Sequence, residues 1–393
     1  MAPQSPPKAT SPVLRLKRGH DRPLVHPWIF KGDVADVGAV APGDAVTVID
    51  GTGRFVGRGF FNPRPALCCR ILTRRDEPLD AAFFASRIGE AIARRGGADP
   101  ARLVWSEGDG LPGLVIDRYG DVLAVQCLTL GMARLRATLV TAARAAVGDL
   151  AAFSADDPAA ASLEGFAPAR GWLDREGPEA VVVDEDGVKL RVTLGGGHKT
   201  GLYLDQRLNH RRLAEAAAGR TILDAFAYAA GFACHALVRG ATSAVCIESS
   251  AEALDSARAN LALNRVSDRA ELVPANVFDE LRRLEREAPR FGLIALDPPP
   301  FARTRTAVEA AARGYKEINL RAMRLLAPGG RLATFSCSHH VAEAAFEDIC
   351  RDAAVDAGIT LRVVERLTQA PDHPVLLTVP ETRYLKGLLL EAV

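Results

Sequence analysis

The pattern of hydrophobic and polar residues changes twice along the chain. Residues 13–75 hold short apolar runs separated by turn residues, which is the spacing of closely packed strands. Strands this short and this near to one another are typical of a small β-barrel. The pattern predicts four of them, at Val13–Lys17, Gly43–Ile49, Phe55–Phe60 and Ala66–Leu72.

Residues 76–193 mix helical and strand-like patterns, and they predict a small central α+β domain. The Ala-rich stretch Ala151–Pro168, with its scattered acidic residues, predicts a loop. Apolar residues at helical spacing predict helices at Phe83–Arg95 and Met132–Ala146. Two hairpins are expected, one joining Leu114–Asp117 to Val122–Leu128 and one joining Val181–Val183 to Val188–Thr193.

From about Leu194 onward, strand and helix patterns alternate, which indicates an α/β sheet. Seven strands are expected, and the last two are expected to form a closing hairpin with an antiparallel edge. We therefore predict a Rossmann-like, seven-stranded mixed sheet over residues 194–393. The predicted strands are Thr221–Phe226, Ser243–Glu248, Ala270–Pro274, Leu293–Asp297, Arg331–Ser336, Leu361–Val364 and Lys386–Leu390, with helices near 206–218, 231–239, 251–263, 307–326 and 341–356.

The 393 residues carry a formal net charge of +1, which argues against a nucleic-acid partner until the charge is divided by segment. Residues 1–75 contain 12 Lys and Arg against 5 Asp and Glu. Residues 76–190 contain 11 against 19, and residues 191–393 contain 26 against 24. The basic front end predicts a phosphate-binding face, with a solvated barrel surface as the alternative. Its arginines on or beside the predicted strands are Arg54, Arg58, Arg64, Arg70, Arg74 and Arg75.

The sequence contains no run of about 18 uncharged apolar residues, so no membrane-spanning helix is expected. Met1–Thr10 is Pro-rich and lacks an apolar signal core, and we expect residues 1–12 to form a disordered tail. The seven cysteines include no CxxC pair, which disfavours a zinc ribbon and fits reduced thiols. A cytoplasmic protein is therefore expected.

The first strand of the predicted sheet ends near Asp224, and a turn of small residues leads to Gly231. Ligands of open α/β sheets bind at the carboxyl ends of strands, close to this first turn. The G-x-G-x-x-G fingerprint of nicotinamide enzymes is absent, because Gly231 is the only glycine in the turn. The turn better suits a cofactor without phosphates, such as S-adenosylmethionine.

Polar residues follow the next two strands. Glu248 comes 24 residues after Asp224 and is placed to accept both hydroxyls of a ribose. Because Ser249 and Ser250 follow it at a helix start, helix capping is the alternative. Asn276 follows the third strand, where it is expected either to read an adenine edge or to cap the next helix.

The fourth strand ends in Asp297-Pro-Pro-Pro-Phe301. Prolines stiffen this turn and present the preceding acid in a fixed position. The pattern is typical of methyltransferases that modify a nucleobase, in which the acid bonds the ring and the aromatic residue stacks on it. A plain proline turn is the alternative.

The fifth strand ends in Ser336-Cys-Ser-His-His340, a polar sequence rather than a core one. We therefore interpret Cys337 as a nucleophile that lies beside Asp297 if the two strands are neighbours. Buried cysteines are usually apolar fillers, which is the interpretation of Cys127, Cys234 and Cys246. His339 and His340 could form half a metal site, but no matching ligand cluster is visible in the sequence, and no metal is expected.

A glycine-rich segment precedes the sheet, from Gly195 to Arg207, and it lacks the spacing of a P-loop. Its Tyr203, Gln206 and Arg207 are expected to close over the carboxylate of a cofactor.

Taken together, these motifs resemble the bacterial large-subunit ribosomal RNA cytosine methyltransferases that make 5-methylcytosine. The resemblance covers nearly the whole chain, and it implies an N-terminal RNA-binding PUA domain before a central domain and a class I S-adenosylmethionine fold. It rests on Lys199–Arg207, Asp297–Phe301, Ser336–Ser338, His26–Phe30, Gly57–Asn62, Glu107–Gly113, Arg313–Asn319 and Ala370–Pro374.

The resemblance also implies the members of the cofactor site. The chain departs from the family at three positions, with Ala230 where a glycine is frequent, Pro300 where a lysine is frequent and Asn276 where an aspartate is frequent. The first and third departures could alter cofactor geometry or affinity, and the second could alter target contact. The implied residues are Tyr203, Gln206, Phe226, Tyr228, Gly231, Glu248, Asn276 and Asp297, to which we add Arg207, Asp224, Ser249 and Val277.

The reaction expected on this basis starts with attack of the Cys337 thiolate on carbon 6 of cytosine. Asp297 would support the ring nitrogen while carbon 5 accepts the methyl group. An amino-methyltransferase of adenine or guanine and a non-catalytic RNA-binding protein are the alternatives, and the missing glycine fingerprint disfavours a nicotinamide oxidoreductase. The expected partner is large-subunit ribosomal RNA, and a homodimer is left open.

Overall fold

The computed structural model describes residues 12–19, 25–195, 200–302 and 304–393. Residues 1–11 of the expected tail lie outside the described residues, as do residues 196–199 of the glycine-rich segment. The chain forms two compact units, one of Met1–Pro178 with Pro374–Thr382 and one of Glu179–His373 with Arg383–Val393. The extents of the three predicted domains stay a prediction.

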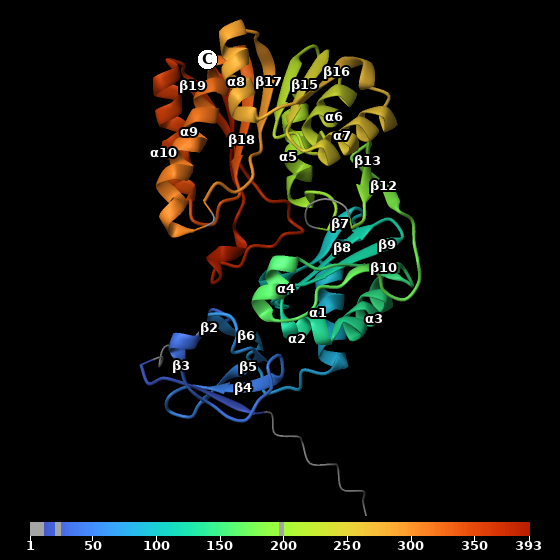
Figure 1. Cartoon of the computed structure of the whole chain (residues 1–393), viewed down its shortest axis with the longest axis vertical. Helices are drawn as coiled ribbons and strands as arrows, with labels where there is room; N and C mark the ends of the chain where they lie inside the picture. Colours follow the sequence, from blue (N-terminus) through green and yellow to red (C-terminus); the bar gives the residue numbers. More distant parts are fainter. Residues whose placement is uncertain (1–11, 20–24, 196–199, 303) are drawn as a thin grey trace, which may run out of the picture. The chain divides into compact units, whose positions relative to one another are not determined.

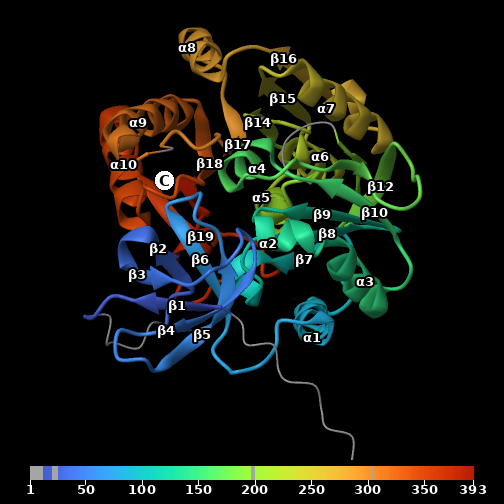
Figure 2. The same cartoon turned by 60° about the horizontal axis from the view of Figure 1, so that its bottom comes forward.

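The first unit begins with a six-stranded sheet in the order β2-β6-β5-β4-β1-β3, and Figure 2 shows β1, β4 and β5 side by side. Neighbouring strands are antiparallel except β1 and β4, which run parallel. Leu14, Val46, Val48 and Cys69 are among the side chains that form its core. The strands are β1 (Val13–Leu16), β2 (Trp28–Phe30), β3 (Val34–Val37), β4 (Ala45–Ile49), β5 (Phe55–Phe61) and β6 (Leu67–Thr73), of which β2 and β3 were not predicted.

A five-stranded sheet in the order β11-β10-β9-β8-β7 follows in the same unit. Its helices α1 and α3 pack against each other. The elements are α1 (Ala81–Ala93), β7 (Ala101–Trp105), β8 (Leu114–Tyr119), β9 (Val122–Cys127), α2 (Leu130–Arg134), α3 (Arg136–Val147), β10 (Ala151–Ala155), α4 (Pro158–Glu164) and β11 (Arg170–Trp172).

The prediction of a loop over Ala151–Pro168 is wrong, because β10 and α4 lie there. Ala152 of β10 is small enough to be fully buried where the strand pairs in parallel with β9. Asp157 caps α4 by accepting the Ala160 N–H at 2.7 Å, and Pro158 stands in the first turn. Gly165, with a φ of 82°, ends the helix.

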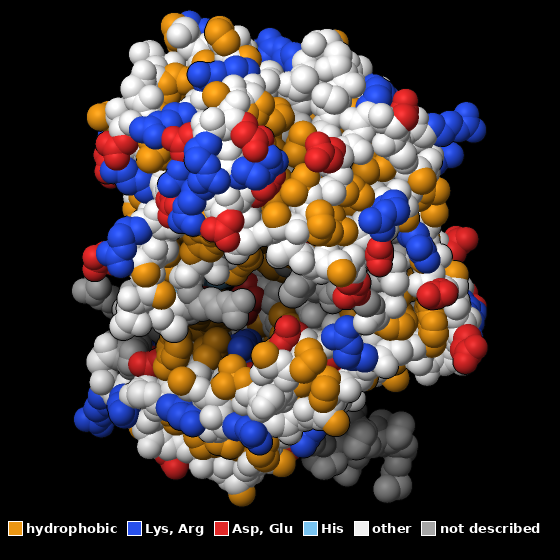
Figure 3. All heavy atoms as spheres, turned by 45° about the horizontal axis from the view of Figure 1, so that its top comes forward, with side chains coloured by type: hydrophobic (Ala, Val, Ile, Leu, Met, Phe, Trp, Pro, Cys, Tyr) orange, Lys and Arg blue, Asp and Glu red, His pale blue; other side chains and the backbone are white. Residues whose placement is uncertain are grey.

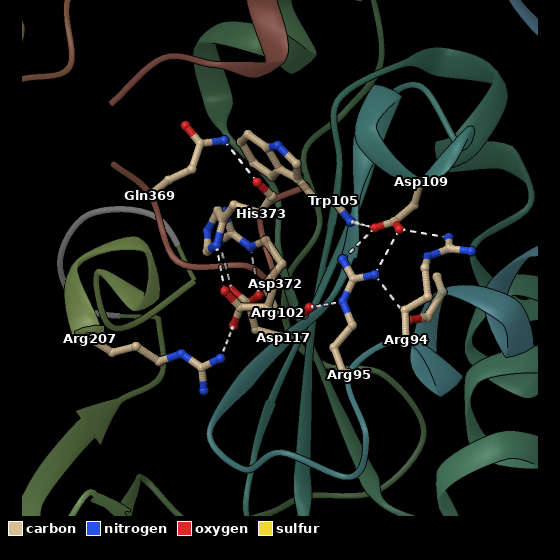
Figure 4. A network of polar contacts seen from close by, with 11 residues as sticks. Arg94, Arg95, Arg102, Trp105, Asp109, Asp117, Arg207, Gln369, Asp372 and His373 are labelled. Atoms are coloured by element: carbon tan, nitrogen blue, oxygen red, sulfur yellow. Dashed lines mark hydrogen bonds and ion pairs between the residues drawn. The ribbon is translucent and has the colours of Figure 1, made fainter. Parts of the chain in front are cut away.

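Asp109 organises the turn that contains the Glu107–Gly113 motif. Its carboxylate accepts hydrogen bonds from Arg95 Nη1 at 2.7 Å, Arg94 Nη2 at 2.9 Å and the Trp105 N–H at 2.7 Å (Figure 4). The side chain of Asp109 is buried, and a buried carboxylate needs such partners. The motif therefore has a structural role in the first unit.

The second unit contains a two-stranded hairpin and a seven-stranded sheet in the order β16-β15-β14-β17-β18-β20-β19. Helices α5, α6 and α7 cover one face, and α8, α9 and α10 cover the other (Figure 1). The elements are β12 (Ala180–Glu185), β13 (Val188–Thr193), α5 (Arg207–Ala214), β14 (Thr221–Ala225), α6 (Gly231–Val238), β15 (Ser243–Glu248), α7 (Ala251–Leu263), β16 (Ala270–Pro274), α8 (Val277–Glu287), β17 (Phe291–Leu296), α9 (Val308–Arg324), β18 (Leu326–Ser336), α10 (Glu343–Ala357), β19 (Leu361–Thr368) and β20 (Lys386–Ala392).

The last strand, β20, does not lie at the edge of this sheet. It pairs antiparallel with β18 on one side and with β19 on the other, so β19 is the edge strand. The expected closing pair of the last two strands, with an antiparallel edge, is confirmed, because the edge strand β19 runs antiparallel to β20. Insertion of β20 brings Lys386 opposite Ser336, next to the end of β18.

Many of the basic side chains of the chain are already paired. Arg54 lies 2.8 Å from Asp50, and Arg70 lies 2.9 Å from Glu164. Figure 3 shows basic and acidic side chains interspersed on the face that it draws. In the part of the chain that is described, no helix is long and apolar enough to cross a membrane.

Candidate active site

Five parallel strands of the second unit, β16, β15, β14, β17 and β18, end at one edge of the sheet. Parallel strands place their carboxyl ends together, which is where ligands of such sheets bind. The residues after the strands gather there as the sequence predicted. They include Phe226 and Tyr228 after β14, Glu248 at the end of β15, Asn276 after β16, Asp297 after β17 and Cys337 after β18.

The turn after β14 has an unusual backbone. Phe226, Tyr228 and Ala230 have φ values of 64°, 47° and 58°, in the left-handed region that side chains with a Cβ rarely adopt. Three such residues among five cost free energy, and strain of this kind concentrates at functional sites. Ala230 therefore takes the conformation that a glycine in this position would adopt without that cost.

Gly231 lies directly against the ring of His210. A Cβ at position 231 would come within 2.6 Å of His210 Cε1, closer than real Cβ contacts. The single glycine retained in this turn is therefore explained by the close approach of α5 and α6. His210 is buried, and its ring packs edge-on against Phe232 with centroids 4.5 Å apart.

Glu248 connects the turn after β14 to the start of α7. Its Oε2 accepts the Tyr228 N–H at 3.0 Å, and its Oε1 accepts the N–H groups of Ser249 at 2.8 Å and Ser250 at 2.9 Å. Glu248 can thus cap α7 and also bind a ribose, since a half-exposed carboxylate oxygen with one or two partners can accept a hydrogen bond from a further hydroxyl. Ser249 is exposed beside it.

Asp224 does not face the open edge of the site. Its side chain is buried, and Oδ2 accepts the Ala233 N–H in the first turn of α6 at 3.0 Å. Burial raises the pKa of Asp224 to about 7, against the hydrogen bond from Ala233 and the charge of His210. Asp224 therefore stabilises the turn between β14 and α6 through its hydrogen bond with Ala233.

The residues after β16 serve the next helix. Asn276 Oδ1 accepts the Phe278 N–H at 2.9 Å and caps α8, as the alternative interpretation predicted, and its side chain is exposed. Val277 is buried in the core of the second unit. Phe301, expected to stack on a base, packs on Tyr315 and Phe278 with centroids 4.6 and 5.7 Å away, and its stacking on a base stays a prediction.

The segment before α5 contributes Tyr203, Gln206 and Arg207. The Tyr203 ring packs edge-on against Tyr228, whose hydroxyl donates to Gly201 O at 3.0 Å. Gln206 Oε1 accepts from Asn209 Nδ2 at 2.6 Å, while its Nε2 is buried without a hydrogen-bond partner among the described residues. A buried donor of this kind fits an acceptor such as the carboxylate of S-adenosylmethionine.

Arg207 has a partner that the sequence pattern did not reveal. Its Nη2 lies 3.5 Å from Oδ2 of Asp372, which belongs to the Ala370–Pro374 motif (Figure 4). Asp372 also lies 2.9 Å from the ring of His373. The Arg207 guanidinium is thus held by the buried carboxylate of Asp372, so the Ala370–Pro374 motif positions Arg207.

Cys337 and the Asp297 turn meet as the neighbouring strands β17 and β18 predict. Cys337 Sγ lies 3.8 Å from the carbonyl oxygen of Pro298, and Cys337 and Asp297 are both half-buried. The next residue, Ser338, accepts the Ala302 N–H at 3.2 Å and contacts the Tyr315 hydroxyl at 2.9 Å. These bonds fix the loop that carries the thiol to the loop that carries the acid.

One further cluster was missed by the sequence analysis. Glu185 Oε1 lies 2.7 Å from His210 Nδ1 and 3.0 Å from His235 Nε2, and the three ligand atoms lie within 4.8 Å of one another. The other ring nitrogen of His235 contacts Arg239 Nη1 at 2.9 Å. His339 and His340, the two histidines that the sequence offers as half a metal site, are exposed and do not belong to this cluster.

Models of two known families match the chain. The model described as S-adenosylmethionine-dependent methyltransferase matches residues 162–390, and the model described as PUA-like domain matches residues 14–74. The chain is 40% identical over 391 residues to ribosomal RNA large subunit methyltransferase I of Salmonella arizonae, covering 96% of each chain. It is 39% identical to the Klebsiella pneumoniae protein of the same name, over 96% of this chain and 97% of the relative.

Solved structures agree on the fold. A candidate S-adenosylmethionine-dependent methyltransferase from Streptococcus mutans aligns with a TM-score of 0.82 and 19% identity, over 96% of this chain and 99% of its own. A candidate methyltransferase solved with SAH gives the same values.

The comparisons confirm the predicted α/β fold with its PUA-like front end, and they confirm S-adenosylmethionine as the cofactor. The resemblance noted from the motifs is confirmed over almost the whole length of the chain. The chain belongs to the family of S-adenosylmethionine-dependent methyltransferases that includes ribosomal RNA large subunit methyltransferase I.

Proposed function

We propose that this enzyme methylates carbon 5 of a cytosine in large-subunit ribosomal RNA, with Cys337 as nucleophile and Asp297 as its acidic partner. The observation that carries the proposal is the contact of Cys337 Sγ with the Pro298 carbonyl, 3.8 Å away and one residue after Asp297. A methyltransferase of exocyclic amines would have no use for a thiol at this position, because the nitrogen lone pair is itself the nucleophile.

Carbon 5 of cytosine is a weak nucleophile until carbon 6 is attacked. The Cys337 thiolate forms a bond to carbon 6, and the electron pair of the 5,6 double bond becomes available at carbon 5. Asp297 donates a hydrogen bond to the ring nitrogen as charge develops there. After methyl transfer a base takes the proton from carbon 5, the double bond re-forms, and the thiolate leaves.

S-adenosylmethionine supplies the methyl group on a sulfonium centre when it is bound. Gln206 Nε2, the buried donor described above, is the group we assign to its carboxylate. Glu248 and Asn276 are assigned to the ribose and the adenine, because they stand at the ends of adjacent parallel strands. Tyr203, Phe226, Tyr228, Gly231, Ser249 and Val277 complete the proposed cofactor site, with Arg207 and Asp224 as supporting residues.

Large-subunit ribosomal RNA is proposed as the substrate because the two relatives above are named for it. The first unit offers a cavity of about 250 Å³ whose lining includes Arg74, Arg75 and Arg87 together with apolar Ile71 and Leu376. Guanidinium groups beside apolar walls suit phosphate and base together. A cytoplasmic location follows from this substrate, and a homodimer stays a prediction for light scattering to test.

The decisive experiment uses a fragment of large-subunit ribosomal RNA with radiolabelled S-adenosylmethionine. Wild-type protein should label cytosine at carbon 5, and Cys337→Ala should lose transfer while keeping its affinity for the cofactor in calorimetry. RNA containing 5-fluorocytidine should trap a covalent complex with the wild type and none with Cys337→Ala, because fluorine cannot leave as the proton does. Methyl label on an exocyclic nitrogen, or full transfer by Cys337→Ala, would rule the proposal out.

A further inference from the structure

Lys386 is the first residue of β20 and lies opposite Ser336, the last residue of β18. Because β20 is antiparallel to β18, its first residue reaches the edge of the sheet where β18 ends and Cys337 follows. The Lys386 Nζ donates a hydrogen bond to Ser338 O at 2.7 Å. The ammonium group is thus bound to the residue directly after the proposed nucleophile.

Lys386 is only 7% exposed as a whole residue, and a charge so deeply placed ordinarily requires an acidic partner. Among the residues that the structure describes, no Asp or Glu forms an ion pair with it. Burial lowers the pKa of Lys386 to about 8, so the amine is still mainly protonated at pH 7. The cation therefore lies near the site without a carboxylate of its own.

The charged and titratable groups around this position come from several elements. Besides burial, which lowers the pKa of Lys386, three charged groups act on it. Cys337 after β18 and Glu343 of α10 raise this pKa, and Arg383 before β20 lowers it. Burial raises the pKa of Tyr315 of α9 and of Tyr203, and the charge of an ionised Cys337 raises both further. The charge of Asp297 also raises the pKa of Tyr203. Cys337 is the nearest of these in the chain to Ser338, whose carbonyl binds the ammonium, and it becomes an anion when it ionises.

We propose that Lys386 is a positioning residue whose ammonium stabilises the ionised form of Cys337 and holds the loop that carries it. The inference rests on the proposed role of Cys337 as the nucleophile. A fixed cation beside a cysteine increases the fraction of thiolate, the form that attacks carbon 6. The same cation would stabilise Cys337 as the leaving group when the product is released, and no additional proton transfer is required.

The reactivity of the thiol can be measured without any methyl transfer. Of the seven cysteines, Cys337 is half-exposed and the other six are buried, so iodoacetamide should modify Cys337 first. We would follow the alkylation rate of the peptide that contains Cys337 by mass spectrometry between pH 5 and pH 10, in the full-length protein. Lys386→Met should react about tenfold more slowly than the wild type at pH 7, which corresponds to about one pKa unit of the thiol. The two rates should converge at the alkaline end of this range, where ionisation of the thiol no longer limits the reaction.

Two further variants separate charge from structure. Lys386→Arg retains a cation and should keep most of the wild-type pH profile, and Lys189→Met, on the exposed face of β13, should leave it unchanged. If Lys386→Met does not fold, as judged by circular dichroism and cofactor calorimetry, Lys386→Gln takes its place in the same measurement. An alkylation profile of the folded Met or Gln variant that superimposes on the wild type would overturn the proposal. The profile reports on Lys386 even if Cys337→Ala were to retain methyl transfer, so the two proposals fail separately.

Discussion

The ring of His210 fills the space in which a side chain at Gly231 would lie, with His210 Nε2 2.7 Å from the ideal Cβ position. The ring cannot easily give way, because Phe232 packs against it and Glu185 binds its other nitrogen at 2.7 Å. Helix α6 can therefore begin where it does only with glycine at its first position.

Gly231→Ala should lower the free energy of unfolding by about 1–3 kcal/mol, the usual cost of overpacking. It should also weaken S-adenosylmethionine binding, since the displaced turn contains Tyr228 and Ala230. Urea unfolding and calorimetry measure the two effects. Gly89→Ala in α1 is the matched control, because a Cβ there meets nothing within 4 Å and alanine favours a helix. A Gly231→Ala protein as stable as the wild type would show that the contact with His210 is not restrictive.

Glu185 and His210 predict a pH-dependent contribution to stability. Burial opposes ionisation of both groups, but the charge of each partner prevails and lowers the pKa of Glu185 to about 2 while raising that of His210 above 6.5. The stabilisation is lost as the pH falls through 2, and it is lost again as the pH rises through the raised pKa of His210. It is therefore complete between the ordinary pKa values of the two groups, 4.5 and 6.5.

Glu185→Gln should cost about 3 kcal/mol near pH 6, the low end of the range for breaking a buried pair. The difference from the wild type should shrink as the pH rises through the raised pKa of His210, because the neutral imidazole no longer attracts the Glu185 carboxylate. Urea unfolding at pH 6, 7.5 and 9 measures it. Glu365→Gln removes the half-exposed partner of Arg212 and should change stability by less than about 1 kcal/mol. A cost for Glu185→Gln that is independent of pH would contradict this assignment of charges.

Gln206 should affect cofactor binding more than stability. Gln206→Met removes a buried donor that has no partner among the described residues, and it also removes the acceptor of Asn209 Nδ2, which keeps Thr368 O at 3.1 Å. The protein without cofactor should therefore lose no more than about 1 kcal/mol of stability, the usual net value of one hydrogen bond. S-adenosylmethionine should bind about tenfold or more weakly, because a hydrogen bond to a charged group contributes about 1.5–3 kcal/mol. Calorimetry and thermal unfolding give both quantities.

Gln126→Met in β9 is the matched control for that variant. It removes a donor that is satisfied by Ala155 O at 3.0 Å, so stability should fall and cofactor affinity should not change. Unchanged cofactor affinity in Gln206→Met would exclude Gln206 from the cofactor site.

The strand ends of the second unit were predictable from the sequence because each strand is a short apolar run followed by a polar residue. Asp297 and Cys337 could be placed side by side on the condition that their two strands are neighbours, since parallel neighbours end at the same edge. Lys386 could not be placed there, because the sequence does not say which strand an antiparallel β20 joins. Its position depends on β20 entering between β18 and β19.

The cluster of Glu185, His210 and His235 could not be predicted from the sequence, for a different reason. Glu185 ends β12, His210 lies in α5 and His235 in α6, and their meeting depends on packing between these elements. No spacing in the chain relates them. The roles of Asn276 and Phe301 were ambiguous because a capping residue and a ligand contact, or a core aromatic and a stacking one, have the same local sequence.

RNA binding should depend on salt through the cavity arginines of the first unit, whereas cofactor binding should not. Arg74 donates to the carbonyl oxygens of Val56 and His26, which makes it structural, so Arg75 is the better residue to change. Arg75→Ala should weaken binding of an RNA fragment several-fold at low salt. If Arg75 contacts one phosphate, the slope of log affinity against log salt should also become shallower by about 0.7–1. Fluorescence anisotropy between 50 and 300 mM salt would measure both, with Arg54→Ala as control because Asp50 already pairs with Arg54. Equal slopes for Arg75→Ala and the wild type would place the RNA elsewhere on the enzyme.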